Sequence, residues 1–169
     1  MIRRSRGREV ALQVLYQLEQ NSGAVTPDVR QFVERRVLGE SELVLYTIGL
    51  VEGVQGHQPE IDETIARLAE NWRLDRMAAI DRNIIRIGAF EILHGRDVPA
   101  KVAINEALKL AKRYSTAQSS RFVNGILDKV LQTAESAGTD VEGDVDPEPS
   151  VAPDPDPEAE PSVEEGPAA

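Results

Sequence analysis

The feature that most constrains the fold is a pair of apolar stripes at helical spacing in residues 97–129, which read DVPAKVAINEALKLAKRYSTAQSSRFVNGILDK. Apolar side chains recur every three or four residues after Pro99, a residue that suits the first turn of a helix because it lacks only an N–H that would be unpaired there. Small polar residues at 115–120 predict a turn or the first turn of the next helix, and a second stripe then runs through Phe122, Ile126 and Val130. Two core-facing helices joined by a short turn are therefore expected.

The same periodicity predicts five further helices, over residues 4–21, 27–39, 41–56, 60–71 and 74–94. No segment of residues 1–135 alternates polar and apolar side chains between hairpin signals, so strands are not expected. The expected fold class is all-α: a compact bundle of about seven helices in two packed groups, helices one to three and helices four to seven. The helix over residues 74–94 is apolar around half its circumference and should be the most buried.

The distribution of charge divides the chain near residue 135. The net charge is −10, but 11 of the 29 acidic residues lie from Ser136 onward, where there is no Lys or Arg, so residues 1–135 are close to neutral. Residues 136–169 are rich in Asp, Glu and Pro and carry only isolated valines, too few to offset the entropy of ordering. We expect one helical domain over residues 1–135 and a disordered acidic tail over 136–169. The tail either keeps the protein soluble or competes with nucleic acid for a basic surface.

Several function classes are not expected from the composition. There is no cysteine, and the two histidines, His57 and His94, lie far apart in the sequence without a partner at a metal-ligand spacing, so no metal site is expected. The acid pair Asp62–Glu63 is interpreted as solvated charge, and no phosphate loop or nucleophile motif is present, so neither catalysis nor a cofactor is expected. No apolar run is long enough to span a membrane or to form a signal peptide, which favours the cytoplasm.

The first candidate functional residues are four arginines among the first eight residues: Arg3, Arg4, Arg6 and Arg8. They fall at the start of the first helix, where the positive end of the helix dipole repels cations. A negatively charged partner would offset that repulsion, and nucleic acid is the usual one because each phosphate that is neutralised releases counterions. The cluster therefore indicates nucleic-acid binding, with an ordinary basic terminus as the alternative.

The second candidate is the start of the last helix, with Arg121, Phe122 and Asn124. Phe122 has the spacing of a core residue, yet it also lies beside a polar turn, where its ring could stack on a base. Asn124 offers a donor and an acceptor to a base edge, and Arg121 can bind a phosphate. Such a site would select single-stranded RNA, because an A-form duplex hides its base edges in a deep, narrow groove.

Motifs in three parts of the chain resemble, in the right order, the NusB family of bacterial transcription antitermination factors. They are RRSRGREVALQVLYQ at residues 3–17, DRNIIRIGAFEIL at 81–93, and PAKVAINEALKLAKRYS followed by SSRFVNGILDKVL at 99–131. The resemblance covers about residues 1–135 and implies the same all-α arrangement. It further implies a non-catalytic protein that binds single-stranded boxA RNA of nascent ribosomal RNA transcripts. It would do so with NusE, a small-subunit ribosomal protein, in an RNA polymerase antitermination complex.

The resemblance also implies two surfaces on this chain. The residues of the RNA surface are Arg3, Arg4, Arg6, Arg8, Ser119, Arg121, Phe122 and Asn124. The residues of the NusE surface are Tyr16, Asp75, Arg76 and Asp81. Two positions depart from the family, since Gln118 stands where some relatives carry an acid and Asp81 where relatives carry glutamate.

Other interpretations remain open. Some relatives form homodimers that cover the RNA surface, so a homodimer is a further expectation for this chain. A NusB-like helical adaptor could act through protein–protein contacts alone, without affinity for RNA. A NusB-like module could instead serve ribosomal RNA maturation, as in the region fused to ribosomal RNA cytosine methyltransferases, although those proteins also need a large cofactor-binding domain.

Overall fold

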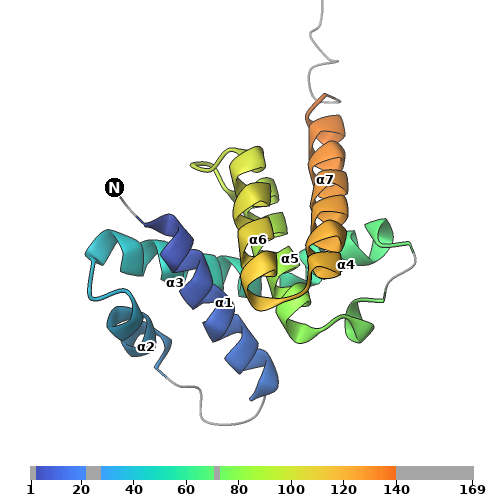
Figure 1. The fold of residues 1–169 in the computed structure, drawn as a ribbon. Coiled ribbons are helices and arrows are strands. Elements are labelled where there is room, and N and C mark those ends of the chain that lie inside the picture. Colours follow the sequence, from blue (N-terminus) through green and yellow to red (C-terminus); the bar gives the residue numbers. More distant parts are fainter. Residues whose placement is uncertain (1–2, 22–27, 71–72, 140–169) are drawn as a thin grey trace, which may run out of the picture.

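The computed structural model describes residues 3–21, 28–70 and 73–139, and within these ranges the chain is helical with no strand (Figure 1). The expectation of an all-α fold with seven α-helices is confirmed. The elements are α1 (Arg4–Gln20), α2 (Val29–Arg36), α3 (Ser41–Gly56), α4 (Gln58–Leu68), the short 3-10 helix η1 (Leu74–Arg76), α5 (Ala79–His94), α6 (Ala100–Tyr114) and α7 (Ala117–Thr139). In this described part, none of the helices combines the length and the apolar character that a membrane span requires.

The helices pack as two groups, as expected. Helices α1, α2 and α3 contact one another, and α5, α6 and α7 form a mutually packed trio against which α4 lies. Figure 1 shows the first group on the left and the second on the right. Contacts of α1 and α3 with α5 join the two groups, so the core is continuous across the bundle.

Helix α5 lies at the centre of this core. Its isoleucines Ile84, Ile85 and Ile87 are at most 1% exposed. Close packing against α7 depends on Gly88, because a Cβ at that position would lie 2.7 Å from a methyl carbon of Leu127. The expectation that this helix is the most buried agrees with its run of buried residues from Asn83 to Ala89.

The prediction of one long helix over residues 74–94 is wrong at its start. The backbone of Met77 and Ala78 is extended, so η1 is separated from α5, which begins at Ala79. The Arg82 guanidinium donates hydrogen bonds to the carbonyl oxygens of Leu74 and Met77, each over 3.0 Å. These bonds satisfy carbonyls that a continuous helix would have paired internally, and they stabilise the break.

Other helix limits differ from the predictions as well, since α2 ends at Arg36 and not at residue 39, and α4 spans Gln58–Leu68 and not residues 60–71. Asp28 caps α2 by accepting a hydrogen bond from the Gln31 backbone N–H (3.2 Å), so the helix begins at Val29 rather than at residue 27. Helix α7 continues to Thr139, four residues past the expected end of the domain. The rest of the expected acidic tail, residues 140–169, lies outside the described part of the chain.

The interpretation of Asp62 as a solvated charge is also wrong. Its carboxylate accepts two hydrogen bonds from the Arg86 guanidinium, at 2.7 and 2.9 Å, and Arg86 is only 6% exposed. Glu19 of α1 accepts further hydrogen bonds from Arg86 (3.2 Å) and Asn83 (2.9 Å) and pairs with Arg82. This network links α1, α4 and α5 through charges that are satisfied as they become buried.

Candidate nucleic-acid interface

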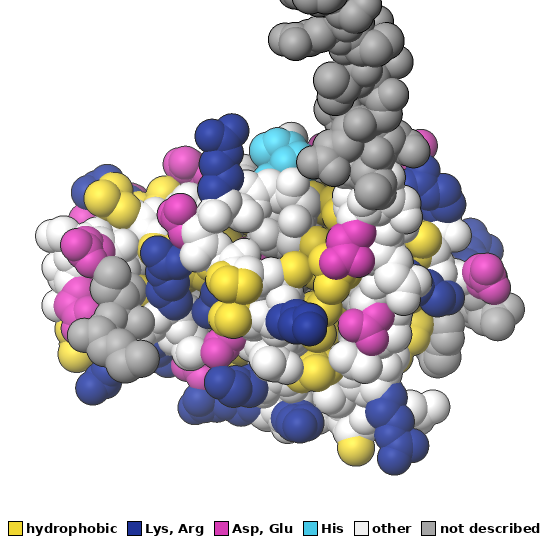
Figure 2. Space-filling model, turned by 90° about the horizontal axis from the view of Figure 1, so that it is seen from above, with side chains coloured by type: hydrophobic (Ala, Val, Ile, Leu, Met, Phe, Trp, Pro, Cys, Tyr) yellow, Lys and Arg dark blue, Asp and Glu magenta, His cyan; other side chains and the backbone are white. Residues whose placement is uncertain are grey.

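The half-buried Arg6 of α1 lies beside basic residues of α2 and α6. Arg6 pairs with Glu9 (2.8 Å), and its second terminal nitrogen donates to the Arg36 carbonyl oxygen at 3.4 Å. Glu9 also pairs with Arg113 near the end of α6. One glutamate therefore lies between two arginines from different helices, which leaves a net positive charge on this part of the surface. Figure 2 shows Lys and Arg side chains along the lower margin of the face drawn there.

The first two arginines lie at the end of this surface. Arg3 is exposed, and the Arg4 guanidinium lies over the Tyr46 ring at 5.0 Å from its centroid, a cation–π contact that orients the side chain. A groove of about 860 Å³ separates the start of α1 from the start of α6. The groove is lined by Arg3, Arg4, Ser5, Arg6, Arg8, Glu9, Asp97, Val98, Pro99, Val102 and Glu106.

Arg8 does not fit the prediction that it contacts RNA. Its side chain is 3% exposed, and its Nε and one Nη each donate a 2.9 Å hydrogen bond to the Glu91 carboxylate. Burial alone would lower the pKa of Arg8, but the hydrogen bonds and negative charge of Glu91 outweigh it and raise that pKa. The Tyr46 hydroxyl donates to the same carboxylate over 2.6 Å. Arg8 is therefore a buried structural cation, whereas its three neighbours in the predicted cluster reach the surface.

The start of α7 presents the second predicted set. Thr116 caps this helix, because its Oγ1 accepts a hydrogen bond from the Ser119 N–H at 3.0 Å. The Ser119 hydroxyl donates to Asp81 over 2.9 Å. Arg121 is exposed, and Phe122 and Asn124 are half-buried.

Phe122 is half-buried and packs against the edge of the core. This position is compatible with a core residue and with a ring that stacks on a base. Arg113 lies in the last turn of α6, shortly before α7 begins, and pairs with Glu9 of α1. This ion pair ties the helix that carries the predicted arginines to the end of α6. The prediction omitted two basic residues, Arg36 and Arg113, which lie close to Arg6 and Glu9 of α1. The sequence signal for Arg113 was the basic run KLAKRYS.

The predicted partner surface is only partly exposed. Tyr16 is 39% exposed on α1, and Asp75 and Arg76 are exposed on η1. Asp81, by contrast, is 9% exposed; one oxygen accepts from Ser119, and the other, Oδ1, is buried without a hydrogen-bond partner in the described chain. The prediction that Asp81 offers its carboxylate to a partner does not fit this burial.

A groove of about 850 Å³ extends beside Asp75 between the first and second groups of helices. Glu19, Arg82 and Arg86 line it, so the charges that hold α1 to α5 also form its wall. Burial and the nearby charge of Arg86 lower the pKa of Arg82. Because Arg82 binds the carbonyls of η1 and pairs with α1, it fixes η1 relative to the helix that carries Tyr16.

One group of side chains within the described ranges could hold a metal ion. It consists of His57, Glu60 and His94, whose ligand atoms lie within 4.8 Å of one another. The two histidines are far apart in sequence, but the fold brings them together with Glu60. The group lies outside both predicted surfaces, and its geometry is described below.

Comparison with known proteins gives consistent results for sequence and structure. The sequence model of the NusB family matches residues 5–132. The transcription antitermination protein NusB of Myxococcus xanthus is 46% identical over 130 residues, which cover 75% of this chain and 93% of that protein.

Two solved structures share the fold. The structure of T. maritima NusB superimposes with a TM-score of 0.69 and 32% identity, covering 78% of this chain and 92% of the other. A structure of the antitermination factors NusB and NusE in complex with dsRNA gives a TM-score of 0.69 and 25% identity, covering 79% and 99%.

Proposed function

This chain belongs to the NusB family, and we propose that it is a transcription antitermination factor that binds RNA together with NusE. The observation that carries the proposal is the basic surface at the start of α1, where Arg3, Arg4 and Arg6 lie close in sequence and Arg6 shares Glu9 with Arg113 of α6. The similar protein from Myxococcus xanthus bears the same functional name, and the similar NusB–NusE structure holds RNA.

The two parts of this surface suit different parts of an RNA. Exposed guanidinium groups bind phosphates of any sequence, and their contribution weakens as salt rises. Ser119, Phe122 and Asn124 offer a hydroxyl, an aromatic ring and an amide, which can stack on or hydrogen-bond to a splayed base. We therefore propose single-stranded boxA RNA of nascent ribosomal RNA transcripts as the target, although the similar complex contains dsRNA.

The partner NusE is proposed to bind the side of the bundle that presents Tyr16, Asp75 and Arg76. These residues are exposed, and Arg82 holds their two elements together. Two adjacent proteins contacting one RNA strand bind it at high effective concentration, so the pair should bind more tightly than either alone. In this proposal the protein is a non-catalytic subunit of an RNA polymerase antitermination complex in the bacterial cytoplasm.

RNA titration with and without NusE, at two salt concentrations, tests the proposal. We expect boxA-like single-stranded RNA to bind more tightly than a scrambled strand or a duplex, and NusE to increase the affinity. Equal affinity for all RNAs with no effect of NusE would contradict the assembly. Binding of NusE without any RNA affinity would instead support the helical adaptor.

Three variants separate the roles of the residues. Arg6→Ala should weaken all RNAs alike and reduce the salt slope by about 0.7 for a single strand. Asn124→Ala should reduce the preference for boxA-like over scrambled RNA by roughly 1–3 kcal/mol. The matched control is Arg67→Ala, which removes an exposed arginine of α4 and should leave both quantities unchanged.

The role of the Phe122 ring needs its own variant. Phe122→Leu keeps an apolar side chain at the core edge but removes the aromatic ring. Loss of about 1–3 kcal/mol of RNA binding with a steady melting temperature would identify a stacking ring. A lower melting temperature with unchanged RNA affinity would show that Phe122 is a core residue only.

A further inference from the structure

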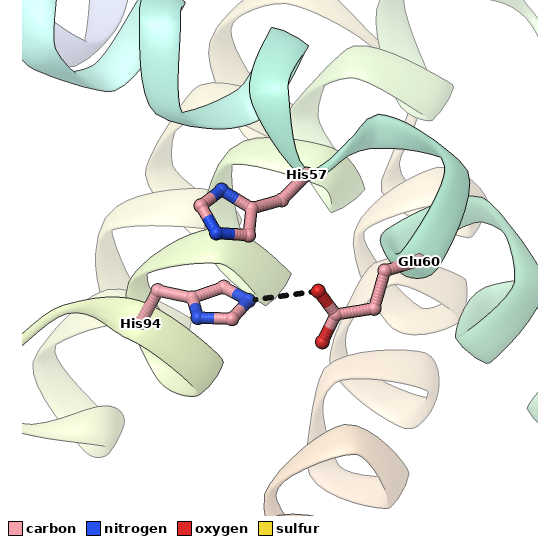
Figure 3. A group of neighbouring side chains, drawn as sticks. All are labelled: His57, Glu60 and His94. Carbon is pink, nitrogen blue, oxygen red and sulfur yellow. Dashed lines mark ion pairs between the residues drawn. The ribbon is translucent and has the colours of Figure 1, made fainter.

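Two histidines and a glutamate from separate helix ends meet at one edge of the bundle (Figure 3). His57 lies between α3 and α4, Glu60 is in the first turn of α4, and His94 is the last residue of α5. The two imidazole rings lie 4.0 Å apart between centroids, and Nε2 of His94 is 3.3 Å from a carboxylate oxygen of Glu60. Figure 3 shows this nitrogen directed at the carboxylate.

Each ring has a nitrogen that is available to a cation. His57 Nδ1 lies 2.9 Å from the Gly53 carbonyl oxygen, which can only accept, so this nitrogen carries the proton and Nε2 keeps its lone pair. A backbone carbonyl that accepts from the second ring nitrogen is the usual support of a metal-bound histidine. His94 Nε2 is buried and makes no hydrogen bond of good geometry, although it lies within ion-pair distance of Glu60.

The distances are close to those of a zinc site. Tetrahedral Zn²⁺ with bonds of about 2.0–2.1 Å places neighbouring ligand atoms about 3.3 Å apart, the separation already found between His94 and Glu60. All three ligand atoms lie within 4.8 Å of one another, so the set must contract slightly around the ion. Glu60 retains 55% exposure of its side chain, which leaves access for the ion and for a water as fourth ligand.

The surroundings hold the rings in place. Phe90 lies 5.7 Å from the His57 ring and 5.8 Å from the His94 ring, and forms an apolar wall behind both. A Cβ at Gly53 would lie 2.2 Å from Phe90, so only glycine allows α3 to approach this closely. The negative ends of α3 and α5 point to the cluster and favour a cation, while the positive start of α4 opposes it.

We propose that His57, Glu60 and His94 form a binding site for Zn²⁺ or a similar divalent transition metal. Two neutral imidazoles and one carboxylate are a ligand set that suits these ions and not Mg²⁺ or Ca²⁺, which prefer oxygen ligands alone. The bound ion joins the α3–α4 junction to the end of α5, and so ties the first group of helices to the second. This role is structural and does not depend on RNA binding.

Titration of the chelator-treated full chain with Zn²⁺, followed by calorimetry and thermal unfolding, tests the site. One ion should bind per chain and raise the melting temperature. Loss of a hydrogen-bond partner of a metal ligand typically reduces metal affinity by about 10- to 100-fold. Glu60→Gln and His94→Gln each remove a ligand itself and should reduce the Zn²⁺ affinity by more than that. The matched control is Glu63→Gln, an exposed residue of α4 outside the cluster with the same change of charge, which should bind Zn²⁺ like the unchanged chain.

Co²⁺ as a second probe distinguishes this site from the carboxylates of the acidic tail. At the proposed site it should give the intense visible absorption of tetrahedral nitrogen–oxygen coordination, and His57→Gln should abolish it. The proposal is overturned if Zn²⁺ binds Glu60→Gln and His94→Gln as tightly as the unchanged chain, or if the unchanged chain shows neither Zn²⁺ binding nor a shift in melting temperature. Circular dichroism before metal addition confirms that each variant is folded.

Discussion

Replacing Arg8 with alanine should destabilise the fold strongly and leave the RNA affinity of the folded protein nearly unchanged. The guanidinium is 3% exposed and makes two 2.9 Å hydrogen bonds with Glu91, which is equally buried. Truncation removes the cation but leaves the Glu91 carboxylate inside the protein with only the Tyr46 hydroxyl as a close donor. An uncompensated buried charge is the largest cost of this change.

The expected magnitude follows from that burial. Breaking a buried ion pair by removing one partner costs about 3–5 kcal/mol, because the remaining charge stays desolvated. For a chain of this size, each kcal/mol corresponds to roughly 2–4 °C, so the melting temperature should fall by roughly 6–20 °C. The double variant Arg8→Met with Glu91→Gln leaves neither charge behind and should recover a large part of the loss.

Thermal and urea unfolding of the unchanged chain, Arg8→Met, Glu91→Gln and the double variant measure the coupling between Arg8 and Glu91. RNA titration at a temperature where Arg8→Ala is still folded provides the second readout, and Arg6→Ala serves as the surface comparison. Arg6→Ala should reduce RNA affinity and the salt slope with little change in melting temperature. If instead Arg8→Ala keeps its melting temperature and loses RNA affinity with a reduced salt slope, the assignment of Arg8 as a structural cation is refuted.

Three further outcomes are expected. Burial, then the charge of Glu91 and the hydrogen bond donated to it, raise the pKa of Tyr46. The hydroxyl therefore stabilises the fold fully below the ordinary tyrosine pKa of about 10, and this contribution is lost as the pH rises above it. Tyr46→Phe should flatten the resulting decline of the denaturant midpoint at alkaline pH. Removing residues 140–169 should leave the melting temperature unchanged and, because it removes only acidic charge, tighten RNA binding at low salt but not at high salt. Leu38 is 89% exposed with φ 56°, so Leu38→Asn should stabilise by about 0.5–1 kcal/mol in thermal unfolding.

The helices were predictable because each depends mainly on the spacing of apolar residues within its own segment. Pro99 and the stripe that follows it predict α6, and the structure places that helix at Ala100–Tyr114. The break before α5 was missed because Met77 and Ala78 carry no breaker signal. It depends on the Arg82 side chain folding back onto η1, a contact that periodicity alone does not reveal.

The candidate surface was less predictable because neighbours in sequence can lie in different environments. Arg8 lies three and seven residues before the buried Ala11 and Leu15, but Arg6 lies four and eight residues before the buried Val10 and Val14. Helical spacing alone therefore did not distinguish the buried arginine from its neighbours. What the sequence could not supply was its partner, because Glu91 is distant in the chain and reaches Arg8 only through the packing of α1 on α5.

The cluster of His57, Glu60 and His94 was also missed because its members come from different parts of the sequence. The spacing rules for metal ligands describe sites within one helix or loop, and His57 and His94 are on different elements. They meet because α3 and α5 pack closely where Gly53 faces Phe90. A site made of helix ends depends on that packing, so it becomes visible only in the folded chain.

The hydrogen bond between Ser119 and Asp81 joins the two predicted surfaces. Ser119 is in the first turn of α7, the proposed RNA side, and Asp81 is in the first turn of α5, directly after the η1 segment that carries Asp75 and Arg76. A partner that packs on η1 therefore restrains the start of α5, and through Asp81 it restrains the α7 residues proposed to contact bases. Restricting those side chains before RNA arrives reduces the entropy lost on binding, in addition to the effect of adding a second RNA-binding protein. NusE would then raise affinity in two physically distinct ways, and only the first of these depends on the 2.9 Å contact between Ser119 and Asp81.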